Sequence, residues 1–211
     1  MTAGPADNKY KTEQESFWAG EFGDDYRARN DGNDLLTCKT VYFGEILKTA
    51  PNVKSILELG CNIGLNLVAL KNINSKFELS GYEINEKSAE IARQRSQGNI
   101  KTGTIIEKIA DTTAYDLVFT AGVLIHINPD HLPMVYENMY CLSKKYIALI
   151  EYYNPNPVEV NYRGHSQRLY KRDFAGELID RYGLNLINYG FIYHRDNYFN
   201  SDDLNWFLLE K

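Results

Sequence analysis

The sequence has few cysteines and no spacing typical of metal ligands. Its three cysteines, Cys38, Cys61 and Cys141, lie far apart, and no CxxC pair is present. An odd and sparse set of this kind is typical of reduced thiols, so we expect a cytoplasmic protein without a disulfide framework. The four histidines show no HxxxH or HExxH spacing, and we therefore expect no bound metal ion.

Positive charge and long apolar runs are also missing. The net charge is −5 and the isoelectric point is about 5.4, which argues against nucleic acid or anionic membranes as partners. No apolar stretch approaches the roughly 18 residues of a membrane span, and the polar start MTAGPADNKYKTEQE is unlike a signal peptide. With 211 residues, 44% of them hydrophobic, the chain suits one globular domain that acts on a small molecule; its oligomeric state is left open.

Apolar strands and amphipathic helices alternate from residue 53 onwards. This rhythm predicts an α/β fold with a mostly parallel sheet that is covered on both faces. Strands are expected at 53–59, 77–83, 100–106, 115–121 and 146–152, and helices at 66–73, 86–96, about 131–142 and 171–183. Asn85 is expected to cap the second of these helices, and Asn33 a helix that ends before Pro51.

The end of the chain breaks that rhythm. Two strands, at 184–194 and 203–210, follow each other without a helix and predict an antiparallel hairpin at the sheet edge. Residues 152–170 are polar and aromatic and are expected to form a long loop. Residues 1–50 are expected to form an N-terminal helical segment, and residues 51–211 a single globular unit.

The stretch ILELGCNIGLN joins the first strand to its helix through two glycines, Gly60 and Gly64. A dinucleotide-binding turn needs a third glycine where this sequence has Asn62. S-adenosylmethionine (SAM) has no phosphate and needs only a close approach of the main chain and an acid for its ribose. Glu83, at the end of the second strand, suits that task, and Glu58 is placed to orient the ammonium end. The alternative is a tight turn with a solvated strand-end charge.

These motifs carry a resemblance to a known family. Residues 53–151 resemble the SAM-binding core of the Rossmann-like (class I) methyltransferases, in which LELGCNIG is the first motif and GYEIN the second. The stretches KTEQESFWAGEFGDDYRARN, VLIHINPD, EYYNPNPVEVNYRGH and KRDFAGELIDRYG extend the similarity to the pseudaminic acid biosynthesis-associated methylases, over nearly the whole chain. The resemblance implies a SAM-dependent methyltransferase of a nonulosonic-sugar pathway.

The resemblance also implies which residues hold the cofactor. The glycine turn would line the methionine moiety, Glu83 would hold the ribose, and Ile84 would pack on the adenine. Many such enzymes carry an acid after the third strand, where this sequence offers Thr104. The predicted cofactor site comprises Trp18, Glu58, Gly60, Cys61, Asn62, Gly64, Glu83, Ile84, Thr104 and Gly122.

Methyl transfer needs aligned reactants, and a base only where the acceptor must lose a proton. His126, just past the fourth strand, is the main candidate for that base, and Tyr153 is a second candidate catalytic residue. A histidine that binds the cofactor or caps the next helix is the alternative. Trp18 and Phe17 are expected in a lid whose aromatic faces attract the sulfonium, or they simply attach the N-terminal segment to the domain.

Basic residues follow the fifth strand. Arg163, His165 and Arg172 would hold a carboxylate or phosphate, as a sugar acid or nucleotide sugar requires. The alternative for Arg172 is a surface pair at a helix start. Tyr152 and Asn154 complete the predicted acceptor site.

Three functions are compatible with these residues. The first is methyl transfer to a hydroxyl or amine of a nonulosonic-sugar pathway intermediate. The second is attack on the aminobutyryl carbon of SAM by its own amine, which yields azetidine-2-carboxylate and methylthioadenosine. The third is a SAM-binding regulator without catalysis.

Overall fold

A seven-stranded sheet forms the centre of the computed structural model, which describes residues 10–29, 32–162 and 165–211. The strand order is β3-β2-β1-β4-β5-β9-β8. Strands β1 to β5 pair in parallel, and β9 pairs antiparallel with both β5 and β8. This confirms the Rossmann-like α/β sheet with a C-terminal antiparallel hairpin. The strands of the sheet are β1 (Ser55–Leu59), β2 (Glu78–Glu83), β3 (Asn99–Thr102), β4 (Tyr115–Ala121), β5 (Ser143–Glu151), β8 (Asn185–Ile192) and β9 (Leu204–Glu210).

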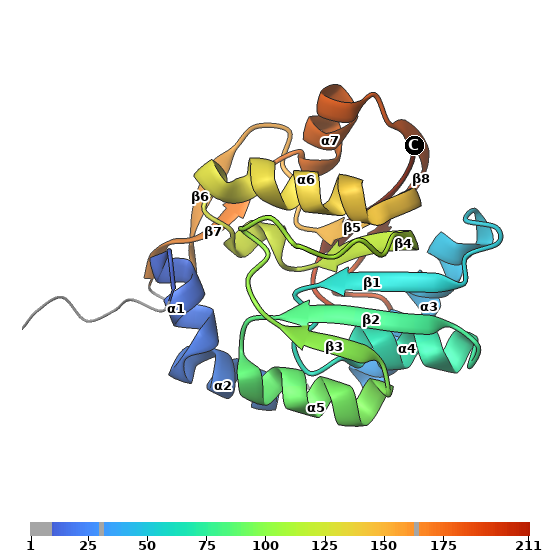
Figure 1. Cartoon of the computed structure of the whole chain (residues 1–211), viewed down its shortest axis with the longest axis horizontal. Helices are drawn as coiled ribbons and strands as arrows, with labels where there is room; N and C mark the ends of the chain where they lie inside the picture. The colour runs from blue at the N-terminus through green and yellow to red at the C-terminus, as the bar shows by residue number, and fades with distance from the viewer. Residues whose placement is uncertain (1–9, 30–31, 163–164) are drawn as a thin grey trace, which may run out of the picture.

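Helices cover both faces of the sheet, as its nearly continuous apolar strands require. One core lies between the sheet and α3, α4 and α5, and the other between the sheet and α6 and α7. Figure 1 shows α4 and α5 on one side of the strands and α6 and α7 on the other. The helices are α1 (Glu13–Ala19), α2 (Glu21–Arg29), α3 (Asn33–Lys48), α4 (Leu65–Ile73), α5 (Glu86–Ser96), α6 (Leu132–Leu142) and α7 (Phe174–Tyr182), with short 3₁₀ helices η1 (Leu124–His126) and η2 (Pro129–His131).

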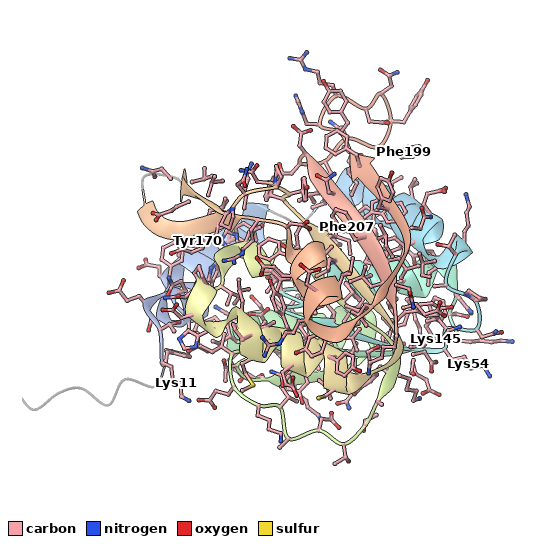
Figure 2. All side chains as sticks on the ribbon, turned by 90° about the horizontal axis from the view of Figure 1, so that it is seen from above. Lys11, Lys54, Lys145, Tyr170, Phe199 and Phe207 are labelled. Carbon is pink, nitrogen blue, oxygen red and sulfur yellow. The ribbon has the colours of Figure 1, made fainter. Side chains whose placement is uncertain are left out.

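The strand order reverses between β1 and β4, and a ligand site is expected at the carboxyl ends of these two strands. Chain connections leave β1 towards β2 on one side and β4 towards β5 on the other, so the turns after these strands face a common crevice. In Figure 1, α1 and α2 and the two strands β6 and β7 lie at the arrowhead end of the sheet. Figure 2 shows Lys11 and Tyr170 at that end, and Lys54 and Lys145, near the starts of β1 and β5, at the opposite end.

The segment expected to be a long loop contains a hairpin. Strands β6 (Val158–Tyr162) and β7 (His165–Lys171) pair antiparallel as a second, two-stranded sheet. Alternating residues in VEVNY and HSQRLY permit this pairing, although two prolines and the polar composition suggested a loop. Strand β3 is also shorter than expected, because residues 105 and 106 turn into the core beside α6.

The two predicted helix caps have different outcomes. Asn85 is the N-cap of α5, and its side chain accepts a hydrogen bond from the Ser88 N–H at 3.0 Å. Asn33, by contrast, is the first helical residue of α3, and Gly32 occupies the cap without a side-chain hydrogen bond. The predicted division at residue 50 stays a prediction, and α3, which lies before it, contributes Phe43 and Ile46 to the core.

None of the helices in the described ranges is both long enough and apolar enough to span a membrane.

Candidate functional site

A cavity of about 190 Å³ opens at the carboxyl ends of β1, β2, β3 and β4. Its lining combines the turns after these strands with residues from α1, α2 and α3. The predicted cofactor residues that border it are Trp18, Gly60, Cys61, Asn62, Glu83, Ile84, Thr104 and Gly122, and His126 borders it too. One cavity therefore joins most of the predicted cofactor site to the predicted base.

The turn after β1 brings bare main chain to this cavity. Gly60 has φ +81°, and a Cβ there would lie 2.6 Å from a methyl group of Val123, so a side chain does not fit. The N–H groups of Gly60 and Cys61 both donate to the carbonyl oxygen of Tyr82, at 2.8 and 2.9 Å. These bonds hold the turn against the end of β2.

Glu83 ends β2 and is buried at the cavity wall. Its Oε1 accepts from the N–H of Asn85 at 2.8 Å, and its Oε2 accepts from the N–H of Asn62 at 2.7 Å. Burial raises the pKa of Glu83, while these amide donors lower it. A carboxylate has about four lone-pair sites. Glu83 can therefore hold the glycine turn and still accept a hydrogen bond from a ligand hydroxyl group.

Two predicted cofactor residues lie outside the cavity lining. Gly64, the N-cap of α4 with φ +76°, faces α5, where a Cβ would come within 3.1 Å of Ala92. It is therefore needed for helix packing. Glu58 is fully buried, and its Oε1 accepts from Nδ2 of Asn66 at 2.5 Å. Its Oε2 has no hydrogen-bond partner among the described residues. Glu58 therefore does not border the cavity itself, but it holds the side chain of Asn66, which does.

The position after β3 acquires a carboxylate from another element. Thr104 donates a short hydrogen bond from its hydroxyl to Oε1 of Glu15, a buried residue of α1 that also lines the cavity. Sequence reasoning missed Glu15. The available signal was a capping box, because Thr12 caps α1 and receives the N–H of Glu15 at 3.1 Å. That signal indicates a helix start and says nothing about Thr104.

Trp18 and His126 meet above the cavity. Their ring centroids are 4.6 Å apart, at an angle of 51°. The indole Nε1 of Trp18 is buried and has no hydrogen-bond partner in the described part of the chain. Asn85 donates from Nδ2 to the carbonyl oxygens of Trp18 and Ala19, at 3.4 and 3.3 Å, and to Asp24 at 3.1 Å. The same side chain thus caps α5 and attaches α1 and α2 over the cavity.

Glu151 holds the turn that carries His126, and sequence reasoning missed it as well. It ends β5, is buried, and accepts on Oε1 from the N–H groups of Val123 and Leu124, both at 3.1 Å. Burial raises the pKa of Glu151 to about 7, and these amides lower it in part. An acid that closes an apolar strand, as in YIALIEY, was the signal in the sequence.

Of the predicted acceptor residues whose side chains the structure describes, Tyr152, Asn154 and Arg172 do not border the cavity, and neither does Tyr153. Tyr153 packs its ring 5.9 Å from that of Phe207 and is 40% exposed. Arg172 pairs with Glu177 at 2.5 Å, and Tyr136 donates to the same carboxylate at 2.7 Å. The guanidinium is thus paired with a carboxylate of α7, the helix that begins two residues later, as in the alternative of an ion pair at a helix start.

The remaining acceptor residues are described only in part, so their predicted role stays a prediction. Tyr152 lies beneath Lys171, whose Nζ is 4.7 Å from the ring centroid, and neither Tyr152 nor Asn154 borders the cavity. Arg163 lies outside the described residues, and for His165 only the backbone is described, in β7 opposite Tyr162. Within the described ranges, no three His, Cys, Asp or Glu side chains gather closely enough to hold a metal ion.

Comparisons with known proteins agree with this architecture. Residues 56–145 match the family model described as a methyltransferase domain. Residues 56–145 therefore match a methyltransferase domain, and the sheet around them has the fold of the class I SAM-dependent methyltransferases. The structure of magnesium protoporphyrin IX methyltransferase from Synechocystis PCC 6803 with bound S-adenosylhomocysteine is similar, with a TM-score of 0.69, 14% identity, and coverage of 94% of this chain and 100% of that one. DesVI of Streptomyces venezuelae has a TM-score of 0.64, 12% identity, and coverage of 90% and 98%.

A curated relative shares sequence with part of this methyltransferase domain. It is the tRNA N(3)-methylcytidine methyltransferase of Schizosaccharomyces pombe, 23% identical over 151 residues. The match covers 64% of this chain, and the chain spans about half, 48%, of that relative.

The cofactor of this methyltransferase domain is SAM, and the residues present fit it. One cavity is bordered by Gly60, where a side chain would clash with Val123, by Glu83, a buried carboxylate with unused lone pairs, and by Trp18, whose buried indole N–H has no partner among the described residues. These groups suit a ligand with close main-chain contact, a hydroxyl group and a further polar group.

Proposed function

We propose that the protein transfers a methyl group from SAM to a small-molecule acceptor bound in the same cavity. The observation that carries this proposal is the single cavity bordered by the Gly60–Asn62 turn, by Glu83 and by His126. When bound, SAM supplies an electrophilic methyl group on a sulfonium whose leaving group is neutral. The protein's contribution is then to hold donor and acceptor in line and to exclude water.

Each wall of the cavity has a separate task in this proposal. Glu83 accepts a hydrogen bond from a ribose hydroxyl, and the main chain of residues 60–62 approaches the methionine end. Ile84 and Thr104 border the adenine end, with Glu15 at the position where other enzymes carry an acid after β3. Trp18 covers the site, since its carbonyl is anchored to Asn85.

His126 is the base that takes a proton from an acceptor hydroxyl. It is buried at the cavity, its ring is fixed against Trp18, and its backbone turn is held by Glu151. Tyr153 has no part in this step, because it packs against Phe207 and does not border the cavity. An amine acceptor would need His126 only for orientation, since a neutral amine can attack before it loses its proton.

The acceptor that we propose is a hydroxyl or amine of a nonulosonic-sugar pathway intermediate in the cytoplasm. The sequence resemblance to the pseudaminic acid biosynthesis-associated methylases supports it. A small acceptor is supported by the position of α1 and α2 over the cavity, and the net charge of −5 disfavours a polynucleotide. The named substrates of the similar proteins, a tRNA and a porphyrin, provide two further acceptors to test.

A second candidate function is favoured by one observation. The predicted acceptor residues Tyr152, Asn154 and Arg172 do not border the cavity, whereas aromatic side chains such as Trp18 and Tyr26 do. An aromatic-lined site that does not include these three residues suits the cyclisation of SAM itself, which forms azetidine-2-carboxylate and releases methylthioadenosine. Binding without turnover, as in a regulator, is the third possibility.

Mass spectrometry of the purified protein separates these functions. The protein is incubated with SAM alone, and then with a panel of free and nucleotide-activated nonulosonic acids, a tRNA pool and magnesium protoporphyrin. S-adenosylhomocysteine that forms only with one acceptor, beside a product one methylene heavier, supports the proposal and identifies the acceptor. Methylthioadenosine from SAM alone would establish the cyclase instead, and no turnover in any mixture would contradict both enzymatic functions.

A further inference from the structure

A lysine from a helix outside the matched methyltransferase region borders the cavity. Lys39 belongs to α3, which precedes β1, and lines the cavity beside Asn66 of α4. Its Nζ donates to Oδ1 of Asn66 at 2.7 Å and to the hydroxyl of Tyr42 at 3.4 Å. No carboxylate among the described residues lies within ion-pair distance of Lys39. Of the three donors of the ammonium, these neutral acceptors take two.

The position of this ammonium group is set by three buried, hydrogen-bonded side chains, Tyr42, Asn66 and Glu58, which we call the buried polar row. Tyr42 also donates to Oδ1 of Asn66, at 3.0 Å, so the amide oxygen faces two donors. Nδ2 of Asn66 therefore points the other way, to the carboxylate of Glu58. Tyr42, Asn66 and Glu58 are all buried, so none of them can turn towards solvent instead. The row fixes where Lys39 presents its remaining N–H.

The charge of Lys39 is incompletely balanced in this arrangement. Burial lowers the pKa of Lys39, and the charges of Glu58 beyond Asn66, of Cys38 and of Asp202 raise it without offsetting the effect of burial. Removing an ammonium group from water is costly unless an anion pairs with it. An anionic group in the cavity would supply that partner directly and would form a charge-assisted hydrogen bond with the free donor.

We propose that Lys39 binds a carboxylate in the cavity, and that this carboxylate is the one at the amino-acid end of SAM. This inference rests on the proposed function. Asn66 lies in the first turn of α4, directly after the Gly60–Asn62 turn, whereas Glu83 and Thr104 follow β2 and β3 on the other side. A ligand whose ribose lies at Glu83 therefore has its amino-acid end on the side of Lys39.

Two sources of a carboxylate have to be distinguished, namely SAM and an acidic acceptor. Calorimetry with pairs of ligands does this without any turnover. SAM and S-adenosylhomocysteine carry the carboxylate, and decarboxylated SAM lacks it but keeps the amine, the sulfonium, the ribose and the adenine. The wild-type protein, Lys39→Met and Lys48→Met are compared. Lys48 is the matched control, because it is an exposed lysine in the last turn of the same helix.

We expect Lys39→Met to weaken binding of SAM and S-adenosylhomocysteine by about 10- to 100-fold, which corresponds to one lost charge-assisted hydrogen bond. Decarboxylated SAM should bind Lys39→Met and the wild type with the same affinity, which also shows that the variant is folded. Lys48→Met should match the wild type for every ligand.

Other outcomes overturn specific parts of the inference. Equal losses for SAM and decarboxylated SAM would make Lys39 a structural residue, and no loss for either would remove it from the site. Unchanged binding of SAM, together with weaker binding of N-acetylneuraminic acid to the S-adenosylhomocysteine-loaded variant, would assign the carboxylate to the acceptor and overturn the assignment to SAM. A wild-type protein that binds neither SAM nor S-adenosylhomocysteine would overturn the proposed function itself.

Discussion

Several side chains at the cavity perform two tasks because each has more than one polar atom. Asn85 caps α5 with Oδ1 and anchors α1 and α2 with Nδ2. Glu83 holds two backbone amides and keeps unused lone pairs at the cavity. Substitution of such a residue changes ligand binding and local structure together. Two variants of the same residue, one that keeps a hydrogen-bond acceptor and one that removes it, are therefore needed to separate the two effects.

Glu83→Ala is expected to weaken SAM binding by about 10- to 100-fold, since hydrogen bonds to a charged group contribute about 1.5–3 kcal/mol. Glu83→Gln should lose less, because its amide oxygen still accepts. Isothermal titration calorimetry measures both, with Glu78→Ala, at the exposed start of the same strand, as the control. Equal affinity of Glu83→Ala and the wild type would exclude Glu83 from the ribose site.

His126→Asn is expected to lower kcat by about 10² to 10⁴-fold with the acceptor found by mass spectrometry, because a positioned base contributes this much to hydroxyl activation. The affinity for SAM should remain within a few-fold. His194→Asn is the matched control, since His194 is exposed and pairs with Asp203 at 2.8 Å. Full activity of His126→Asn would indicate an amine acceptor that needs no base.

At the scale of elements, the contact between α4 and α5 explains a glycine that the sequence assigned to the cofactor. We expect Gly64→Ala to lower the free energy of unfolding by about 1–3 kcal/mol, because φ +76° is strained for a side chain and Ala92 would lie 3.1 Å away. SAM affinity of the folded variant should be unchanged.

Urea unfolding measures this loss of stability, and Gly44→Ala is the control. Gly44 lies inside α3, where a Cβ would meet nothing within 4 Å, so alanine should stabilise the protein by about 0.5–1 kcal/mol. Weaker SAM binding by Gly64→Ala with unchanged stability would instead support the role in the cofactor site that the sequence predicted.

At the scale of the whole molecule, stability should depend on pH through Glu151. Its pKa is about 7 in the folded protein, above the ordinary value of 4.5. Between these values the folded state binds more protons than the unfolded chain, so the free energy of unfolding falls as the pH rises. We expect Glu151→Gln, which cannot titrate, to reduce the fall between pH 5 and pH 8 by about 2 kcal/mol.

Urea titrations at both pH values test this expectation, and Glu159→Gln, in the exposed part of the second sheet, is the control. Glu58 is also buried with a raised pKa, but it is present in the wild type and in the variant, so its contribution cancels in the comparison. An identical pH dependence of Glu151→Gln and the wild type would show that Glu151 is ionised in the folded protein throughout this range.

The sequence alone was sufficient for the features that depend on neighbouring residues. Strand β4 has the predicted bounds, Asn85 caps α5, and the last two strands form the antiparallel hairpin. Alternating or continuous apolar residues record which faces are buried, and turns and caps depend on residues a few positions apart. The glycine turn and Glu83 were therefore also visible in the sequence as a candidate cofactor site.

Only the tertiary structure decided which distant side chains meet. Thr104 bonds to Glu15 from α1, Glu151 supports the turn before His126, and Arg172 is paired with Glu177. The first of these pairs joins residues 89 positions apart. Partners of this kind follow from the order of the strands and the packing of the helices, which no local pattern contains. Lys39 was not predicted for the same reason, since its proposed role depends on the packing of α3 against α4 beside the cavity.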